Sequence, residues 1–234
     1  MEEKAPQDLP SVVLSVENLR VETAPHGGRA IVRGISFNVH AGETVCVVGE
    51  SGSGKSVTSL AVMGLLPKDS LVATRGRILL DGEDVLKVTP NRMRELRATR
   101  VAMVFQEPMT ALNPVQRVGH QIEEVLTLHT RMGRAERRAK VLHMLERVDL
   151  PDVERIYESY PHQLSGGQRQ RIVIAMALIL RPRLLIADEP TTALDVTTQK
   201  QILKLIRELQ EEEQTAVVFI THDFGVVSEI ADRI

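Results

Sequence analysis

The chain is poor in cysteine and in aromatic residues, and its charges nearly cancel. Because Cys46 is the single cysteine, no intramolecular disulfide can form, and its apolar neighbours predict a small buried side chain. Only 3% of the residues are aromatic. With a net charge of -2, the whole chain has no electrostatic attraction to nucleic acid or to anionic lipid. Local basic patches are still compatible with this balance.

Long hydrophobic runs are also missing. The longest, Ile172–Leu180, is bounded by Arg171 and Arg181 and falls short of the roughly 18 apolar residues that cross a bilayer. The first residues, Met1–Lys4, lack the charged-then-apolar order of a secretory signal. We therefore expect a cytoplasmic protein that reaches a membrane only through a partner.

What the sequence does contain is a complete phosphate-loop pattern: a glycine, four variable residues and then Gly-Lys-Ser. It follows the apolar run Thr44–Val48 and precedes the helix-like segment Val57–Leu66, which is the context that the motif requires. Its glycines let backbone N–H groups close around a polyphosphate at the positive end of the helix. Lys55 would reach the β- and γ-phosphates, and the Ser56 hydroxyl would coordinate Mg²⁺. The residues of the loop are Gly49, Glu50, Ser51, Gly52, Ser53, Gly54, Lys55 and Ser56.

Polar side chains follow several apolar strands of the same inferred sheet. Asp188 and Glu189 come directly after the run Leu184–Ala187, where a phosphate-loop NTPase holds Mg²⁺ with the aspartate. The adjoining Glu189 carboxylate would polarise the water that attacks the γ-phosphate. Gln106 and His222 each follow another apolar strand, so both could reach the same edge. The pattern predicts ATP hydrolysis at this edge.

The order of strands and helices predicts an α/β fold. We expect residues 1–10 to form a flexible N-terminal tail and strands over 12–21, 31–39 and 76–80 to make an antiparallel β layer before the nucleotide core. Helical periodicity dominates residues 107–163, which we interpret as an inserted α-helical subdomain. Buried strands alternate with helices through the rest, as in a doubly wound phosphate-loop NTPase core of the RecA-like type.

Two runs of basic residues, Arg92–Arg100 and Arg131–Lys140, have two interpretations. Either is a possible nucleic-acid face. In the first run no aromatic residue is interleaved with the arginines, which favours a solvated helix surface.

A second glycine-rich helix start lies at Ser165, Gly166, Gly167 and Gln168. Ser165 would cap a helix that continues to Leu180. Such a start attracts anions, yet the chain has only one phosphate loop. Two interpretations stay open: a spare helix cap, or a part that completes a nucleotide site on another polypeptide in a head-to-tail pair.

Together these motifs resemble those of the nucleotide-binding subunits of ATP-binding-cassette (ABC) transporters. The phosphate loop, the Gln106 loop, the signature Leu164–Gln168, the Asp188-Glu189 pair, the loop 193–195 and His222 occur in the family's order and span nearly the whole chain. The resemblance implies ATP and Mg²⁺ as cofactors and a second ABC ATPase subunit or domain as partner.

The resemblance also implies roles for individual residues. Ser56, Gln106 and Asp188 would hold the metal, and Glu189, His222 and Gln106 would be catalytic. The residues expected to bind ATP held by the opposite protomer are Ser165, Gly166, Gly167 and Gln168.

Longer stretches, 105–114, 160–171 and 187–196, look like those of the dipeptide, oligopeptide, glutathione and nickel importer ATPases. That family implies two membrane permease subunits, an extracytoplasmic solute-binding protein and a peripheral place on the cytoplasmic face of the inner membrane. The residues after Gln106 would receive the coupling helix of the membrane subunit. We therefore expect an ATPase that powers import of a peptide-type solute and binds no nucleic acid. The alternative is a soluble ABC-type ATPase acting on nucleic acid or the ribosome; a non-catalytic scaffold is disfavoured by Glu189.

The sequence departs from the family at two points. The family usually stacks an aromatic ring on adenine from the loop after the first strand, but residues 22–30 offer only His26. Adenine would then stack on His26 or be held loosely. The chain also stops at Ile234, soon after His222, where relatives continue, so we expect a truncated cassette or a fragment.

Overall fold

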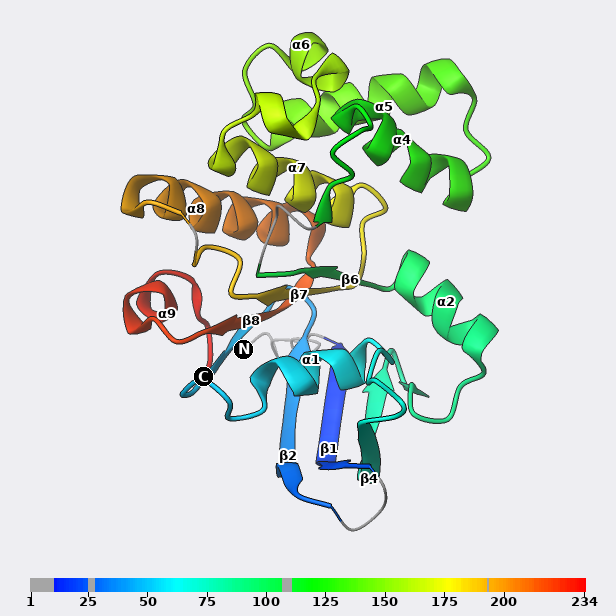
Figure 1. Ribbon diagram of the computed structural model, residues 1–234, viewed down its shortest axis with the longest axis vertical. Helices are drawn as coiled ribbons and strands as arrows, with labels where there is room; N and C mark the ends of the chain where they lie inside the picture. Colours follow the sequence, from blue (N-terminus) through cyan, green and yellow to red (C-terminus); the bar gives the residue numbers. More distant parts are fainter. Residues whose placement is uncertain (1–10, 25–27, 107–110, 193) are drawn as a thin grey trace, which may run out of the picture.

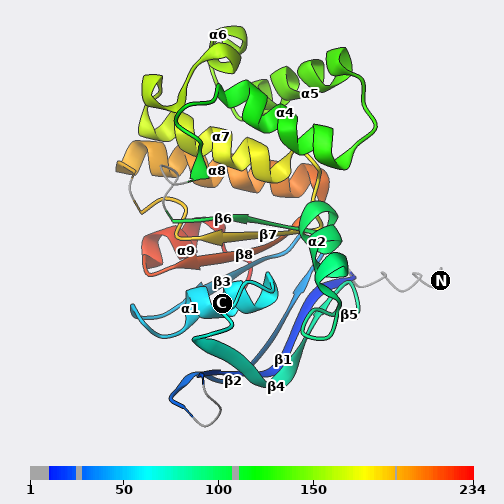
Figure 2. The ribbon, with the colours of Figure 1, turned by 45° about the vertical axis from the view of Figure 1, so that its right-hand side comes forward.

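The computed structural model describes residues 11–24, 28–106, 111–192 and 194–234. The elements are stacked in layers, which Figures 1 and 2 show from two sides. The layers, in order, are the helices α4 (Val118–His129), α5 (Arg134–Arg147) and α6 (Val153–Glu158); the helices α7 (Gly166–Leu178) and α8 (Val196–Glu213); a parallel sheet; the helix α1 (Lys55–Val62); and an antiparallel sheet.

The antiparallel sheet contains a longer third strand than the sequence predicts. That strand pairs with its neighbour from Leu71 onwards, before the expected start at Gly76. Gly76 has a φ of +96° at a register shift, and a Cβ there would lie 2.5 Å from the Glu17 carbonyl oxygen. The glycine is therefore a bulge inside the strand, which a sequence pattern does not distinguish from a turn before it. The sheet has the order β2 (Ala30–His40), β1 (Val12–Thr23), β4 (Leu71–Leu80) and β5 (Glu83–Asp84).

The parallel sheet positions the residues of the candidate site. Its order is β3 (Thr44–Val48), β8 (Ala216–Thr221), β7 (Leu184–Asp188) and β6 (Val101–Val104), and every neighbouring pair is parallel. Because the strands run the same way, their carboxyl ends share one edge, the edge at which ligands bind in open α/β sheets. The phosphate loop, Gln106, Glu189 and His222 follow four of these ends in the chain.

Buried residues of the parallel sheet alternate between two hydrophobic cores. In β7, Leu184 and Ile186 belong to the core shared with α1 and the antiparallel sheet. Leu185 and Ala187 belong to the core shared with α7, α8 and the helical layer. Both faces are covered, which explains why these strands are continuous apolar runs. Cys46 in β3 is buried as expected, and burial raises the pKa of its thiol to about 11.

The helical layer is packed around Tyr157 of α6. A Cβ added at Gly119 of α4 would lie 2.3 Å from the tyrosine ring, so the glycine permits this close contact. The Tyr157 hydroxyl donates to Glu123 at 2.7 Å, and the Arg138 guanidinium lies 4.4 Å from the ring centroid. The helices of this layer fall inside 107–163, and those limits for a subdomain stay a prediction.

Helix α1 begins and ends earlier than the expected range 57–66. It starts at Lys55, directly after Gly54, and stops before Gly64, whose φ is +61°. The basic residues 92–100 lie mostly on α2 (Pro90–Thr99), and the chain continues past β8 into α9 (Phe224–Ile230). Among the described residues, no helix is both long enough and apolar enough to cross a membrane.

Candidate active site

The phosphate loop connects β3 to α1 at the carboxyl edge of the parallel sheet. Gly52 and Gly54 have φ angles of +79° and +99°, a backbone conformation that residues with a Cβ rarely adopt. A Cβ at Gly54 would also lie 3.0 Å from the carbonyl oxygen of Ile31 in β2. Glycine at 54 therefore permits both the turn and the close approach to β2. Since α1 starts at the next residue, its positive end lies at the loop.

The side chain of Lys55 folds back across this loop. Its Nζ donates to the carbonyl oxygens of Gly49 at 2.7 Å and Glu50 at 3.0 Å. The residue is only 9% exposed. The Lys55 ammonium group is thus held inside the loop by two uncharged carbonyl oxygens. An anionic ligand would compete with them for the ammonium group, because hydrogen bonds between charged groups are stronger.

Asp188, the last residue of β7, is a buried carboxylate. Burial is the largest influence on its pKa and raises it, and the negative charge of Glu189 raises it further. A hydrogen bond from the Ser56 hydroxyl and the positive charge of Lys55 lower the pKa, but the net shift is upward. A hydroxyl and a carboxylate are the oxygen donors that Mg²⁺ prefers, usually together with substrate phosphates and water. Among the described residues no group of three or more His, Cys, Asp and Glu could hold a metal alone. The Ser56 hydroxyl and the Asp188 carboxylate therefore fit Mg²⁺ as two of its oxygen donors.

Glu189 is the point at which side chains from three segments meet. Gln106 Nε2 donates to Glu189 Oε2 at 3.2 Å, and Thr192 Oγ1 donates to the same oxygen at 3.0 Å. The His222 Nδ1 atom lies 3.2 Å from that oxygen as well. Glu189 has a φ of +49°, and its N–H donates to the Ile220 carbonyl at 2.9 Å. A positive φ is uncommon for a non-glycine residue, and backbone strain of this kind is often found at functional sites.

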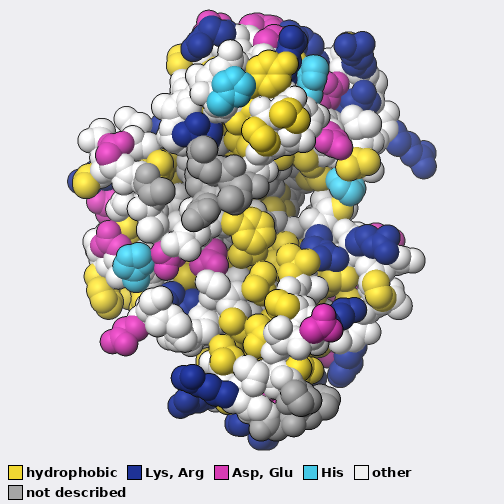
Figure 3. Space-filling view, viewed as in Figure 1, with side chains coloured by type: hydrophobic (Ala, Val, Ile, Leu, Met, Phe, Trp, Pro, Cys, Tyr) yellow, Lys and Arg dark blue, Asp and Glu magenta, His cyan; other side chains and the backbone are white. Residues whose placement is uncertain are grey.

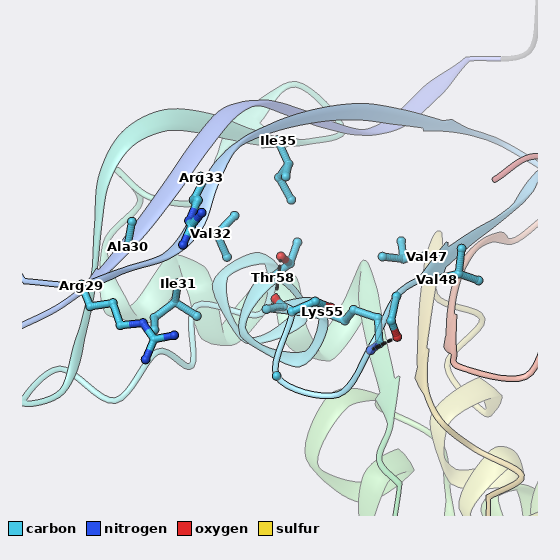
Figure 4. A pocket seen from close by; sticks show the side chains of 14 residues that line it. Arg29, Ala30, Ile31, Val32, Arg33, Ile35, Val47, Val48, Lys55 and Thr58 are labelled. Atoms are coloured by element: carbon cyan, nitrogen blue, oxygen red, sulfur yellow. Dashed lines mark hydrogen bonds between the residues drawn. The ribbon is translucent and has the colours of Figure 1, made fainter.

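Two cavities flank the phosphate loop and share part of its wall. The larger, of about 650 Å³, lies between the loop and Gln106, Glu189 and His222. The smaller, of about 480 Å³, lies between the loop and the start of β2, as Figure 4 shows. Every residue from 49 to 56 lines at least one of them, and 31, 52, 54 and 55 line both. The two spaces therefore meet at Lys55.

The second glycine-rich helix start is not part of either cavity. Ser165 caps α7: the Gln168 N–H donates to its hydroxyl at 3.2 Å, and its own N–H donates to Gln168 Oε1 at 3.0 Å. A Cβ at Gly167 would lie 2.7 Å from Thr198, so this glycine has a packing reason within the chain. At Gly166 the nearest atom to an added Cβ is 3.9 Å away. A role for this helix start on a second molecule stays a prediction.

Sequence reasoning missed Thr192, although its place three residues after Glu189, where a turn can bring the two side chains together, was a usable signal. The expected tail over residues 1–10, His26, residues 107–110 of the Gln106 loop, and Ala193 lie outside the described residues.

The basic runs are partly neutralised: Arg92 pairs with Glu83 and Glu95, and Arg138 pairs with Glu154. This pairing weakens the nucleic-acid interpretation.

The chain is similar to the ATP-binding proteins of several transport systems. It is 53% identical over 223 residues to the dipeptide transport ATP-binding protein DppD of Bacillus subtilis, covering 95% of this chain and 67% of that one. It is 47% identical to the oligopeptide transport ATP-binding protein OppD of the same organism, with 95% and 62% covered. It is 54% identical to the glutathione import ATP-binding protein GsiA of Pectobacterium atrosepticum, with 95% and 37% covered. The chain thus spans between 37% and 67% of the length of these relatives.

Solved structures are similar along most of the chain. The ATP-binding cassette MJ0796, a dimer in a post-hydrolysis state with ADP and phosphate, matches with a TM-score of 0.79 and 31% identity, covering 92% of this chain and 90% of that one. The cbiO1 protein of Clostridium perfringens matches with a TM-score of 0.78 and 29% identity, covering 92% and 80%.

The fold and the site define a phosphate-loop ATPase domain. The family model described as ABC transporter matches residues 32–192. The chain belongs to the ABC transporter family.

Proposed function

We propose that the chain binds and hydrolyses Mg-ATP and that this hydrolysis powers import of a peptide-type solute through membrane permease subunits. The convergence of Gln106, Thr192 and His222 on the Glu189 carboxylate, across a cavity from Lys55, carries the proposal. The peptide-type solute is supported by the transport and import proteins that the chain is similar to.

Each residue of the site has a chemical task in this reaction. Lys55 would leave the loop carbonyls and bind β- and γ-phosphate oxygens, while loop N–H groups hold the remaining oxygens. Ser56, Asp188 and Gln106 would hold Mg²⁺, which neutralises charge on the phosphates when bound. Glu189 would take up the proton of the attacking water. His222, whose side chain is 57% exposed at the cavity mouth, would contact the γ-phosphate.

A second cassette would complete the site. The start of α7 presents an exposed Ser165 and a Gly166 whose added Cβ would meet Leu194 only at 3.9 Å, and neither residue lines a cavity beside the phosphate loop of its own chain. A head-to-tail pair would place this helix end against the nucleotide of the partner, where N–H groups and the helix dipole favour an anion. The dimeric cassette structures that the chain resembles support this arrangement.

The surface that would meet the membrane subunits is an apolar groove of about 600 Å³ between α2, β6, α4 and α7. Figure 3 shows hydrophobic side chains gathered in a hollow in the middle of this face. Phe105, which precedes Gln106, lines the groove and is 43% exposed, and Leu65 at its edge is 38% exposed. A short helix of a permease subunit fits such a groove. The chain would then lie peripherally on the cytoplasmic face of the inner membrane, with a solute-binding protein on the far side.

A nucleotide titration tests the proposed function. The variant Lys55→Ala should lose most of its affinity for Mg-ATP in calorimetry, because the triphosphate loses its one buried cationic partner. The matched control Lys68→Ala removes an exposed lysine outside both cavities and should bind as the wild type does. Equal affinity in the two variants would contradict a phosphate site at this loop.

Purification of the full-length protein from membranes tests its partners. Integral membrane subunits should co-purify with it, and a variant with Phe105→Asp in the groove should lose them while still binding nucleotide. Recovery of polynucleotide without membrane subunits would instead favour the soluble alternative.

A further inference from the structure

The smaller cavity beside the phosphate loop has two cationic side chains at its edge. Arg29 and Arg33 line it together with Lys55, and both arginines are exposed. Within the described part of the chain, neither arginine forms an ion pair, and none of the described lining residues is aromatic. We propose that Arg29 and Arg33 bind the nucleobase, with their guanidinium planes stacked on it in place of an aromatic ring. This inference rests on the proposed ATPase function.

The arrangement of the two cavities places the base in the smaller one. The larger cavity contains Glu189, Gln106 and His222, so it has to take the γ-phosphate end of the substrate. The cavities meet at Lys55, where the phosphates pass from one to the other. The base and ribose are then left to the side bounded by β2.

The walls of the smaller cavity match an aromatic heterocycle. Ile31, Val32 and Ile35 of β2 and Val47 and Val48 of β3 line it. These aliphatic side chains can cover the base, and a planar guanidinium stacks well on an aromatic face. Figure 4 shows the two arginines on the β2 side of the cavity and Lys55 on the opposite side.

The position of Arg29 is fixed by the turn that precedes it. Its backbone N–H donates to the Thr23 hydroxyl at 2.9 Å, and the Thr23 N–H donates to the Arg29 carbonyl at 3.1 Å. A Cβ at Gly28 would lie 2.1 Å from the Thr23 hydroxyl oxygen, so these two hydrogen bonds depend on this glycine. Arg33 is fixed by the ladder between β2 and β1, where it is paired with Arg20. Both cations therefore project from an ordered frame.

Stacking on the face of the base has a consequence for specificity. Every purine presents a similar π face, and a guanidinium stacked on that face does not read the groups at the edge of the ring. We therefore expect adenine and guanine nucleotides to bind with affinities within about 3-fold of each other.

The decisive experiment compares a ligand that has a base with one that lacks it. Calorimetry measures binding of the Mg²⁺ complexes of β,γ-imido-ATP and of inorganic tripolyphosphate to Arg29→Ala, Arg33→Ala and the double variant. Affinity for the nucleotide should fall about 3-fold in each single variant and about 10-fold in the double variant, which corresponds to two exposed cation–π contacts. Affinity for tripolyphosphate should stay within about 2-fold of the wild type, since that ligand has no base.

Three further variants separate stacking from charge and from other residues. Arg33→Lys keeps the positive charge but lacks the planar guanidinium group, so its affinity for the nucleotide should equal that of Arg33→Ala. Arg75→Ala removes an exposed arginine of β4 outside both cavities and should change nothing. His26→Ala tests the histidine to which the sequence first points, and should weaken nucleotide binding less than the arginine variants do.

Several outcomes would overturn the inference. Equal losses for nucleotide and tripolyphosphate would mean that the arginines act as general positive charge. Unchanged nucleotide affinity in the double variant, or a larger loss in His26→Ala, would place the base elsewhere. If the wild type binds the nucleotide and tripolyphosphate with equal affinity, base recognition is refuted but the phosphate site is not. If the wild type binds neither ligand, the proposed function is refuted as well.

Discussion

Replacing Glu189 with glutamine isolates the proton acceptor of the proposed reaction. Three side chains converge on one oxygen of this carboxylate: Gln106 at 3.2 Å, Thr192 at 3.0 Å and His222 at 3.2 Å. An amide oxygen in the same place can still accept from the glutamine and the threonine. We therefore expect Glu189→Gln to change the free energy of unfolding by no more than about 1 kcal/mol.

The effect on hydrolysis should be far larger. A positioned general base contributes roughly 10²- to 10⁴-fold to a rate, which corresponds to about 3 to 5 kcal/mol of barrier. The amide cannot accept the proton of the attacking water, so phosphate release from Mg-ATP should fall by at least 100-fold. Binding of Mg-ATP, measured by calorimetry, should stay intact, and size-exclusion chromatography with ATP should show an accumulated dimer.

The control for this variant is Glu211→Gln, which removes a carboxylate from the exposed face of α8, where it pairs with Arg207. It should hydrolyse ATP at the wild-type rate. If Glu189→Gln retained a rate within about 10-fold of the wild type, the assignment of Glu189 as the base would be wrong. If it lost nucleotide binding together with turnover, the carboxylate would be shaping the pocket instead.

Two further substitutions test the neighbouring parts of the site. Because burial raises the pKa of Asp188, the unfolded chain releases that proton at lower pH than the folded protein, and stability falls as pH rises between the two pKa values. At pH 8, Asp188→Asn should therefore melt at a higher temperature than the wild type, and this difference in melting temperature should shrink toward pH 4. Mg-ATP should no longer raise the melting temperature of the variant. A difference in melting temperature that does not change with pH would contradict this reasoning. Gly166→Ala adds a methyl group 3.9 Å from its nearest neighbour, so melting should be unchanged while ATP-dependent dimerisation is lost, and normal dimerisation would refute a nucleotide contact there.

The sequence predicted the arrangement of those parts of the candidate site that are local in the chain. A glycine-rich loop between an apolar strand and a helix can be recognised from one continuous stretch, as can Asp188 and Glu189 at the end of a buried strand. The parallel sheet could be predicted for a related reason: strands covered on both faces are uninterrupted apolar runs. Gln106 and His222 were placed at the correct sheet edge by the same argument.

Most of the features that sequence reasoning missed depend on contacts between distant segments. Gly76 was interpreted as a boundary because its role as a bulge is visible only beside the carbonyl groups of β1. Thr192 has an ordinary place in a turn until its hydroxyl is seen 3.0 Å from Glu189. Arg29 and Arg33 share a cavity with Lys55 only because β2 is folded over the phosphate loop. The contacts of Gly76, Arg29 and Arg33 have no periodicity or spacing that a linear pattern could reveal, whereas the three-residue spacing between Glu189 and Thr192 is one that a turn can bring together.

The backbone of Glu189 connects the fold to the chemistry. A φ of +49° is unfavourable for a residue with a Cβ, and the bond from its N–H to the Ile220 carbonyl holds this conformation at the end of the sheet. Continued extended geometry would alternate the side chain to the opposite face from Asp188. The turn instead leaves Asp188 buried beside Ser56, while the neighbouring Glu189 lines the larger cavity with Gln106 and His222. In the proposed reaction the two adjacent acids would take different tasks, metal binding and proton transfer, because the chain bends between them.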